Sequence, residues 1–190
     1  MSTSKILHFK RFCNKIIKQN IDYYRDKLDD RSVLEAIIFP HILADYDPQT
    51  ILDLGREDYQ SFYNEFFINR TLFTIDMNPK HKKFGNPGFH TIDNATNLKK
   101  HYKNNYFDFI LMNGVFGWGL DKEADVQKSF NAIYSILKPG GVFILCYNDD
   151  IIPLDKIKGL NKLKKLNFKP LKGNNFSCSD GKHFYRFYIK

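Results

Sequence analysis

Residues 51–55 read Ile-Leu-Asp-Leu-Gly and residues 71–76 read Thr-Leu-Phe-Thr-Ile-Asp, so each short apolar run meets an acidic residue near its end. Similar apolar runs occupy residues 107–112 and 142–147, and a segment with the apolar spacing of a helix, residues 123–137, lies between them. Strands that alternate with helices in this way predict right-handed βαβ units. They also predict a parallel sheet that is covered by helices on both faces.

The rest of the chain extends this plan at both ends. A helix is predicted over residues 3–29, and a second from near Asp30 to Pro40 or slightly beyond. Further expected elements, in chain order, are a helix over 59–68, a strand over 89–92, helices over 98–102 and 154–163, and extended segments over 168–171 and 183–189. The last two predict a terminal antiparallel hairpin. The expected fold class is therefore α/β: a Rossmann-like, seven-stranded, mostly parallel sheet with a C-terminal antiparallel hairpin in three αβα layers, preceded by N-terminal helices.

Composition narrows the class of protein further. The 190 residues, 43% of them hydrophobic, suffice for one globular domain, and no apolar run is long enough to cross a membrane. The N-terminal residues show no secretory signal. Cys13, Cys146 and Cys178 lie far apart without metal-ligand spacing, so we expect no metal site, no disulfide scaffold and a cytoplasmic setting.

The net charge of +8 raises the question of a nucleic-acid partner. Lysines gather in residues 5–18 and 156–172, and such surfaces can bind phosphates. Arginine, which is favoured for planar phosphate and base recognition, is scarce beside lysine. We therefore favour solvated helix faces over a nucleic-acid surface and keep the second as the alternative.

Polar residues follow the predicted strands one after another. Because a parallel α/β sheet binds ligands beyond the carboxyl ends of its strands, these positions are the candidate site. They are Asp53 with Gly55, Asp76, Asp93, Asn113 with Gly114, and Asn148 with Asp149 and Asp150. One such residue is most often a turn former or a helix cap. Five in succession indicate a ligand site.

With these residues in view, the chain resembles the class I S-adenosylmethionine-dependent methyltransferases over residues 50–190. The matching segments are residues 51–55, residues 74–79 (Thr-Ile-Asp-Met-Asn-Pro), Asp93, residues 107–111, and residues 137–141 (Leu-Lys-Pro-Gly-Gly). The resemblance implies S-adenosylmethionine as cofactor, with residues 1–47 as a helical lead or lid and residues 48–190 as the methyltransferase domain.

The resemblance also implies the cofactor contacts. Gly55 would approach the methionine part, Asp76 the ribose hydroxyls and Asp93 the adenine amino group, with Met77 against the ring. Asn113 and Gly114 would lie near the methyl group. The full set of implied cofactor-binding residues is Asp53, Gly55, Glu57, Tyr59, Asp76, Met77, Asp93, Asn94, Asn113, Gly114 and Val115.

One segment departs from the family pattern. The family continues its turn as Gly-x-Gly-x-Gly, whereas this chain places Glu57 and Tyr59 where the later glycines would stand. Either the site has lost its cofactor, or Glu57 offers a carboxylate to the cofactor's ammonium with Tyr59 packed beside it. We favour the second, because residues 113–121 resemble a bacterial branch of the family with the same replacements. A nicotinamide-binding protein would need GxGxxG after the first strand, which is absent here.

Methyl transfer from a sulfonium needs alignment and exclusion of water more than a dedicated catalytic residue, and none is identified. The acceptor-pocket candidates are Phe116, Trp118, Asn148 and Asp149, together with Tyr23 and Tyr24 of the lead; His41, His90 and His183 are weaker candidates for a base. Short loops favour a small-molecule acceptor. The alternatives are a non-catalytic cofactor- or partner-binding protein and an RNA or nucleotide methyltransferase. The lead could equally be a lid or a cover for one sheet face.

Overall fold

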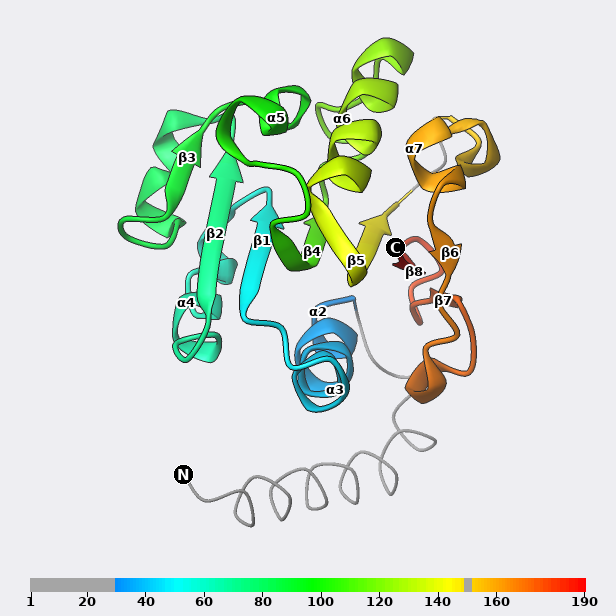
Figure 1. Ribbon diagram of the computed structural model, residues 1–190. Helices are drawn as coiled ribbons and strands as arrows, with labels where there is room; N and C mark the ends of the chain where they lie inside the picture. Colours follow the sequence, from blue (N-terminus) through cyan, green and yellow to red (C-terminus); the bar gives the residue numbers. More distant parts are fainter. Residues whose placement is uncertain (1–29, 149–151) are drawn as a thin grey trace.

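The computed structural model describes residues 30–148 and 152–190, and its centre is a mostly parallel β-sheet (Figure 1). The strands follow the order β3-β2-β1-β4-β5-β8-β6, and β7 also pairs with β8. Their bounds are β1 (Thr50–Leu54), β2 (Thr71–Asp76), β3 (His90–Ile92), β4 (Phe107–Asn113), β5 (Leu137–Tyr147), β6 (Lys164–Lys165), β7 (Asn175–Ser177) and β8 (Phe184–Ile189). Strands β1 to β5 pair in parallel, and β8 is antiparallel to β5, β6 and β7. The predicted fold class is thus confirmed.

Helical segments connect and cover these strands. In chain order they are α2 (Asp30–Val33), the π-helix η1 (Leu34–Ile38), α3 (Phe39–Asp45), η2 (Asp58–Gln60), α4 (Tyr63–Phe66), η3 (Pro79–Phe84), η4 (Ala95–Asn97), α5 (Leu98–His101), α6 (Glu123–Ile136), η5 (Leu154–Lys156), α7 (Lys158–Asn161) and η6 (Lys169–Leu171). None of the helices in the described ranges has the length and apolar character that crossing a bilayer requires.

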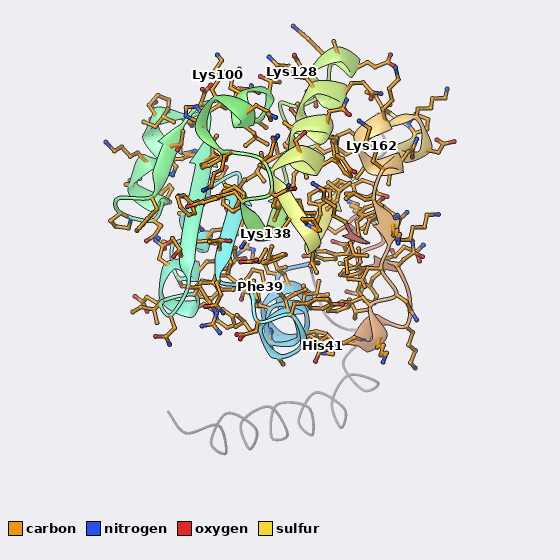
Figure 2. The ribbon with its side chains drawn as sticks, in the orientation of Figure 1. Phe39, His41, Lys100, Lys128, Lys138 and Lys162 are labelled. Atoms are coloured by element: carbon orange, nitrogen blue, oxygen red, sulfur yellow. The ribbon has the colours of Figure 1, made fainter. Side chains whose placement is uncertain are left out.

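The sheet separates two apolar clusters because neighbouring strand residues point to opposite faces. On one face Leu52 and Ile110 pack with the buried side of α6. On the other, Ile51 and Phe109 pack with residues of α2, η1 and α3, among them Phe39 (Figure 2). Residues 30–45 therefore cover a sheet face, whereas the predicted helix over 3–29, with Tyr23 and Tyr24, lies outside the described residues.

The predicted helix from Asp30 continues to Asp45, past Pro40. A proline inside an α-helix usually breaks it, because the ring lacks an N–H and meets the carbonyl one turn earlier. Here the π-helix η1 precedes it, and Pro40 stands in the first turn of α3, where a missing N–H costs little. The helix therefore passes the proline without ending.

The predicted helix over residues 59–68 is instead divided into η2 and α4. The guanidinium of Arg56 donates to the carbonyl of Gln60 at 2.8 Å, and the Asn64 N–H bonds the Ser61 carbonyl, one residue nearer than in an α-helix. Because the Gln60 carbonyl accepts from the Arg56 side chain and not from the Asn64 N–H, the regular i to i−4 hydrogen bonding of an α-helix is interrupted here. The predicted helix over 154–163 is likewise shortened, to η5 and α7.

The C-terminal part also differs from the expectation. The predicted strand over 168–171 is wrong: these residues hold the helical turn η6, and β6 forms the sheet edge instead. Pro170 explains the difference, because it has no N–H for a strand ladder. The described residues contain eight strands rather than seven, since β7 arises within the polar stretch before β8.

The amino ends of the parallel strands are joined by Asp108. Its Oδ2 accepts hydrogen bonds from Thr50 N at 2.8 Å, Thr50 Oγ1 at 2.7 Å and Gln49 N at 3.1 Å, and its Oδ1 accepts one from Lys138 Nζ at 2.7 Å. Burial opposes ionisation, but the bonds from Lys138 and Thr50 outweigh it and hold the Asp108 pKa below its usual value. Nearby, Lys190 Nζ donates to Asn105 and to the carbonyls of Tyr134 and Leu137.

Candidate functional site

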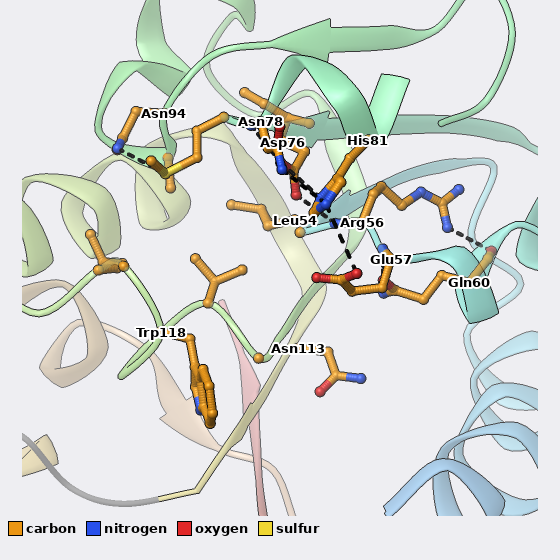
Figure 3. A pocket seen from close by; sticks show the side chains of 18 of the residues that line it. Leu54, Arg56, Glu57, Gln60, Asp76, Asn78, His81, Asn94, Asn113 and Trp118 are labelled. Carbon is orange, nitrogen blue, oxygen red and sulfur yellow. Dashed lines mark hydrogen bonds and ion pairs between the residues drawn. The ribbon is translucent and has the colours of Figure 1, made fainter. Parts of the chain in front are cut away.

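A pocket of about 520 Å³ opens at the carboxyl ends of β1, β2 and β4 (Figure 3). The direction in which successive strands are added reverses here: β2 and β3 lie on one side of β1, and β4 and β5 lie on the other. Ligands of open α/β sheets bind at such a switch point. The lining residues are Leu54, Gly55, Arg56, Glu57, Tyr59, Gln60, Ile75, Asp76, Met77, Asn78, His81, Asp93, Asn94, Ala95, Asn113, Gly114, Val115, Gly117, Trp118, Gly119, Leu120 and Asp121.

Gly55 makes the turn after β1. Its φ is +87°, which favours glycine, and a Cβ at this position would lie 2.7 Å from Val115 Cγ2, so the Val115 side chain would have to shift. Glu57 has a φ of −126°, and Tyr59 lies within η2. Neither adopts the left-handed conformation, which explains how this turn accommodates side chains where the resemblance would place glycines.

Beneath the turn, Arg56 and Asp53 form a buried ion pair, with Nη1 and Oδ2 3.1 Å apart and the two residues 1% and 2% exposed. Arg56 also donates to Asn64 Oδ1 at 2.5 Å. Burial raises the pKa of Asp53 to about 6, although the Arg56 charge opposes this shift. The Asp53 side chain thus supports the turn from below and does not line the pocket, as a residue in direct cofactor contact would.

Asp76 is fixed at the end of β2 by two backbone groups. Its Oδ2 accepts from Arg56 N at 2.8 Å, and its Oδ1 accepts from Asn78 N at 2.7 Å. A carboxylate oxygen has two lone pairs, so each oxygen retains one for a ligand. The carboxylate is therefore held rigidly at the pocket wall with acceptor capacity to spare.

His81 links this carboxylate to Glu57. His81 Nδ1 lies 3.4 Å from Asp76 Oδ1, and His81 Nε2 lies 3.0 Å from Asn78 Nδ2 and 4.0 Å from Glu57 Oε2. The Glu57 side chain is 55% exposed and reaches the pocket, as Figure 3 shows. Tyr59 also lines the pocket, and the Arg31 guanidinium lies 3.9 Å from the centre of its ring.

Asp93, Asn94 and Met77 line the pocket at the ends of β2 and β3. Asn97 Nδ2, His101 Nε2 and Asn94 N each donate to the Asp93 carboxylate at 2.7 Å, and these bonds hold the Asp93 pKa well below its usual value. Met77 is 61% exposed, and its sulfur lies 3.8 Å from Asn94 Nδ2. An exposed thioether beside polar groups can cover the face of a planar ring.

The loop after β4 supplies the remaining wall. Asn113 is 8% exposed and lines the pocket, and its side-chain amide makes no hydrogen bond among the described residues. Phe116 and Leu120 are buried in the core and hold the loop, whereas Trp118 between them is 68% exposed. Figure 3 shows Trp118 at the side of the pocket away from Asn94.

Most of the predicted positions meet in this pocket, and a few do not. Phe116 packs against Phe130 and Tyr147 and is fully buried, so it is a core residue and not part of the pocket wall. Asn148 bonds His183 outside the pocket at 3.1 Å, and Asp149 lies outside the described residues.

The three histidines considered as bases also lie elsewhere. His41 pairs with Asp45, His90 lies 2.9 Å from Thr74 Oγ1, and His183 contacts Asp180, all outside the pocket lining.

Sequence reasoning did not predict five polar lining residues: Arg56, Gln60, Asn78, His81 and Asp121. His81 and Asn78 follow Asp76 closely, and this spacing was the available signal. No sequence signal distinguishes the buried Arg56. The described residues contain no cluster of His, Cys, Asp and Glu side chains suited to a metal ion.

Taken together, a switch-point pocket, an ordered acid after β2 and a glycine turn after β1 define a ligand-binding α/β protein of the Rossmann-like class. The family comparison makes this specific: residues 64–188 match the model of the methyltransferase domain family. The chain belongs to this family. The matched range begins after the departing turn at residues 55–59.

Solved structures show the same fold at low sequence identity. An N-methyltransferase, NodS, from Bradyrhizobium japonicum WM9 is 14% identical with a TM-score of 0.62, over 86% of this chain and 99% of that one. Its complex with S-adenosylhomocysteine gives a TM-score of 0.61 at 14% identity, over 92% and 98%. A SAM-dependent methyltransferase from Archaeoglobus fulgidus gives 0.59 at 13% identity, over 88% and 98%. A search of the curated proteins finds no match in sequence.

Proposed function

We propose that this protein is an S-adenosylmethionine-dependent methyltransferase that acts on a small-molecule acceptor. The observation that carries the proposal is Asp76, held by the Arg56 and Asn78 N–H groups at a switch-point pocket of a methyltransferase-family chain. Its two remaining lone pairs suit a ribose diol. The NodS complex with S-adenosylhomocysteine has the same fold, which supports this cofactor.

The residues present suit the cofactor along the length of the pocket. Asp76 would bind the ribose, Met77 would lie against adenine, and Asn94 and Asp93 would lie at the adenine edge. Asp93 retains only part of its acceptor capacity, because Asn97, His101 and Asn94 N already bond its oxygens. The Asn113 amide lines the pocket and makes no hydrogen bond among the described residues, so its donor and acceptor are available to a polar ligand group.

At the other end, Gly55, Gly114 and Val115 would surround the methionine part, and Glu57 would pair with its ammonium. Glu57 suits this role because its carboxylate lies in the pocket and is 4.0 Å from the nearest nitrogen of His81. Tyr59 would pack beside it. The bound cofactor supplies an activated methyl group, while these residues orient it and exclude water.

A nucleic-acid acceptor has less support. Among the described residues, lysines lie on outer surfaces such as those of α5 and α6, as Lys100 and Lys128 illustrate (Figure 2). Among the described residues, none of the pocket-lining side chains is a lysine. Phosphate groups of a bound nucleic acid would therefore find no lysine in this lining, and the lining Arg56 is buried and paired with Asp53.

Calorimetric titration with S-adenosylmethionine and S-adenosylhomocysteine tests the proposal. Wild-type protein should bind both ligands, and Asp76→Ala should weaken binding by about a hundredfold, because a charged hydrogen-bond acceptor is lost. Lys128→Ala is the control, since this exposed side chain of α6 lies outside the pocket. Absence of binding by the wild type at millimolar ligand would overturn the proposal.

A further inference from the structure

We propose that the methyl acceptor is an organic amine with an apolar or planar body and without phosphate groups. This inference rests on the proposed function. It follows from the charge of the pocket, the exposed indole of Trp118 and the unpartnered amide of Asn113, which together define the chemistry of the acceptor.

The loop after β4 is built to present Trp118. Phe116 and Leu120 are 0% and 2% exposed and fix the two sides of the loop in the core. Gly117 and Gly119 adopt φ values of +88° and +98° on either side of Trp118, and the backbone N–H of Trp118 donates to the Val115 carbonyl at 3.0 Å. The turn thus directs the indole away from the core. Because Trp118 lines the pocket and is 68% exposed, the face of its ring is available for stacking against a ligand.

The pocket is acidic although the protein is basic. Four carboxylates line it, Glu57, Asp76, Asp93 and Asp121, in a chain whose net charge is +8. The one arginine of the lining, Arg56, is 1% exposed and is paired with Asp53 beneath the turn. Apart from Arg56, His81 is the one side chain among the described pocket residues that can carry a positive charge, and it lies between Asp76 and Glu57. Because Glu57, Asp76 and Asp93 are proposed above to hold the cofactor, Asp121 is the lining carboxylate left to attract a cationic acceptor and to repel phosphates and carboxylates.

Trp118 and Asp121 belong to the same loop and both line the pocket. Asp121 is exposed, and its Oδ2 accepts from Gly119 N at 3.3 Å, which leaves the carboxylate further acceptor capacity. An ammonium group can contact both an indole face and a carboxylate, and it gains from each. The buried Asn113 amide offers a donor and an acceptor to the same ligand or to the cofactor.

The transfer to such an acceptor balances without a further reagent. The amine first loses a proton to solvent, and its nitrogen lone pair then forms a bond to the methyl carbon. The carbon–sulfur bond breaks, and its electron pair remains on sulfur. A secondary amine is formed from a primary one, and the proton that the new ammonium carries leaves to solvent as the amine equilibrates.

Trp118 is the single tryptophan of the chain, so its fluorescence reports on this part of the pocket. The experiment uses the full protein saturated with S-adenosylhomocysteine and three probes that share a phenyl ring: phenethylamine, phenylacetate and phenyl phosphate. We expect phenethylamine to change the fluorescence and to bind at least about tenfold more tightly than either anion. Asp121→Asn should weaken amine binding several-fold, whereas the matched Asp155→Asn on exposed η5 should not.

The outcomes separate this inference from the proposed function. If S-adenosylhomocysteine binds but an anion binds as tightly as the amine, or none of the probes binds, the amine inference is wrong while the proposed function stands. An Asp121→Asn protein with unchanged amine affinity also contradicts the inference. If S-adenosylhomocysteine itself does not bind, the proposed function fails first and the inference fails with it.

Discussion

The two ends of strand β4 differ in whether their polar side chains have hydrogen-bond partners within the protein. At the amino end, both oxygens of Asp108 are occupied by hydrogen bonds from Thr50, Gln49 and Lys138. At the carboxyl end of the same strand, Asn113 is 8% exposed, and its amide lines the pocket without a partner among the described residues. One strand thus carries a group that the protein satisfies and a group left for a ligand. The comparison predicts that stability and binding can be altered separately.

The largest effect on stability is expected from Asp108→Ala. Several hydrogen bonds to a charged acceptor are lost and Lys138 is left without its partner, so the free energy of unfolding should fall by about 2–4 kcal/mol. Denaturant unfolding measures this loss. The affinity of the folded protein for S-adenosylhomocysteine should not change, because Asp108 lies at the opposite end of the strand.

Asn113→Ala is the counterpart at the carboxyl end of β4. It should reduce the affinity for S-adenosylhomocysteine by about tenfold, because the amide that can hydrogen-bond the ligand is removed. The free energy of unfolding should change much less than in Asp108→Ala. If Asn113→Ala were the more destabilising change and left binding intact, the contrast between the two ends would be wrong.

The pH dependence of stability should have opposite signs for the buried Asp53 and the half-buried Asp108. Asp53 has a folded pKa of about 6, above its ordinary 3.8, so its contribution is present at low pH and is lost as pH rises through about 6. This shift corresponds to at most about 3 kcal/mol. Asp108 has a lowered pKa, so its contribution is present above the ordinary value and is lost as pH falls through the folded one.

Urea unfolding of the wild type and Asp53→Asn across this range measures the first effect. The difference in unfolding free energy between them should shift in favour of the variant as pH rises from about 4 to 6. A constant difference would show that Asp53 ionises in the folded protein as it does in the unfolded chain.

The smallest expected difference compares two glycines with positive φ. Gly55 has φ +87° and a Cβ there would lie 2.7 Å from Val115 Cγ2, whereas Gly140 has φ +77° and nothing within 4 Å. Alanine at either position should cost about 1–2 kcal/mol from the left-handed backbone. Gly55→Ala should cost more and should also weaken S-adenosylhomocysteine binding in calorimetry. Equal effects of the two substitutions on binding would contradict the role of the Gly55 turn.

The parallel strands and the polar residues at their ends were predictable because both depend on local patterns. Apolar runs of strand length and acids at their ends are visible in residues 51–55 and 71–76 without knowledge of contacts. The division of the helix at η2 was not predictable, since it depends on where the Arg56 side chain bonds. The same holds for Asp53, which pattern places in the site but burial places beneath it.

The loop after β4 illustrates the same limit. Phe116 and Trp118 are aromatic residues two positions apart, and both were expected to face an acceptor. The glycines at 117 and 119 reverse the chain so tightly that only Trp118 leaves the core. Which of two neighbouring aromatics is buried depends on tertiary packing and not on their spacing.

The position of β8 has a consequence for assembly of the sheet. It lies between β5 and β6, although β6 comes earlier in the chain. As the chain is made, β1 to β5 can pair as each successive strand emerges, but β6 has no neighbour in the sheet until residues 184–189 have been synthesised. Until then the edge of β5 remains open, so shortened or stalled chains should expose that edge and be the forms most prone to aggregate.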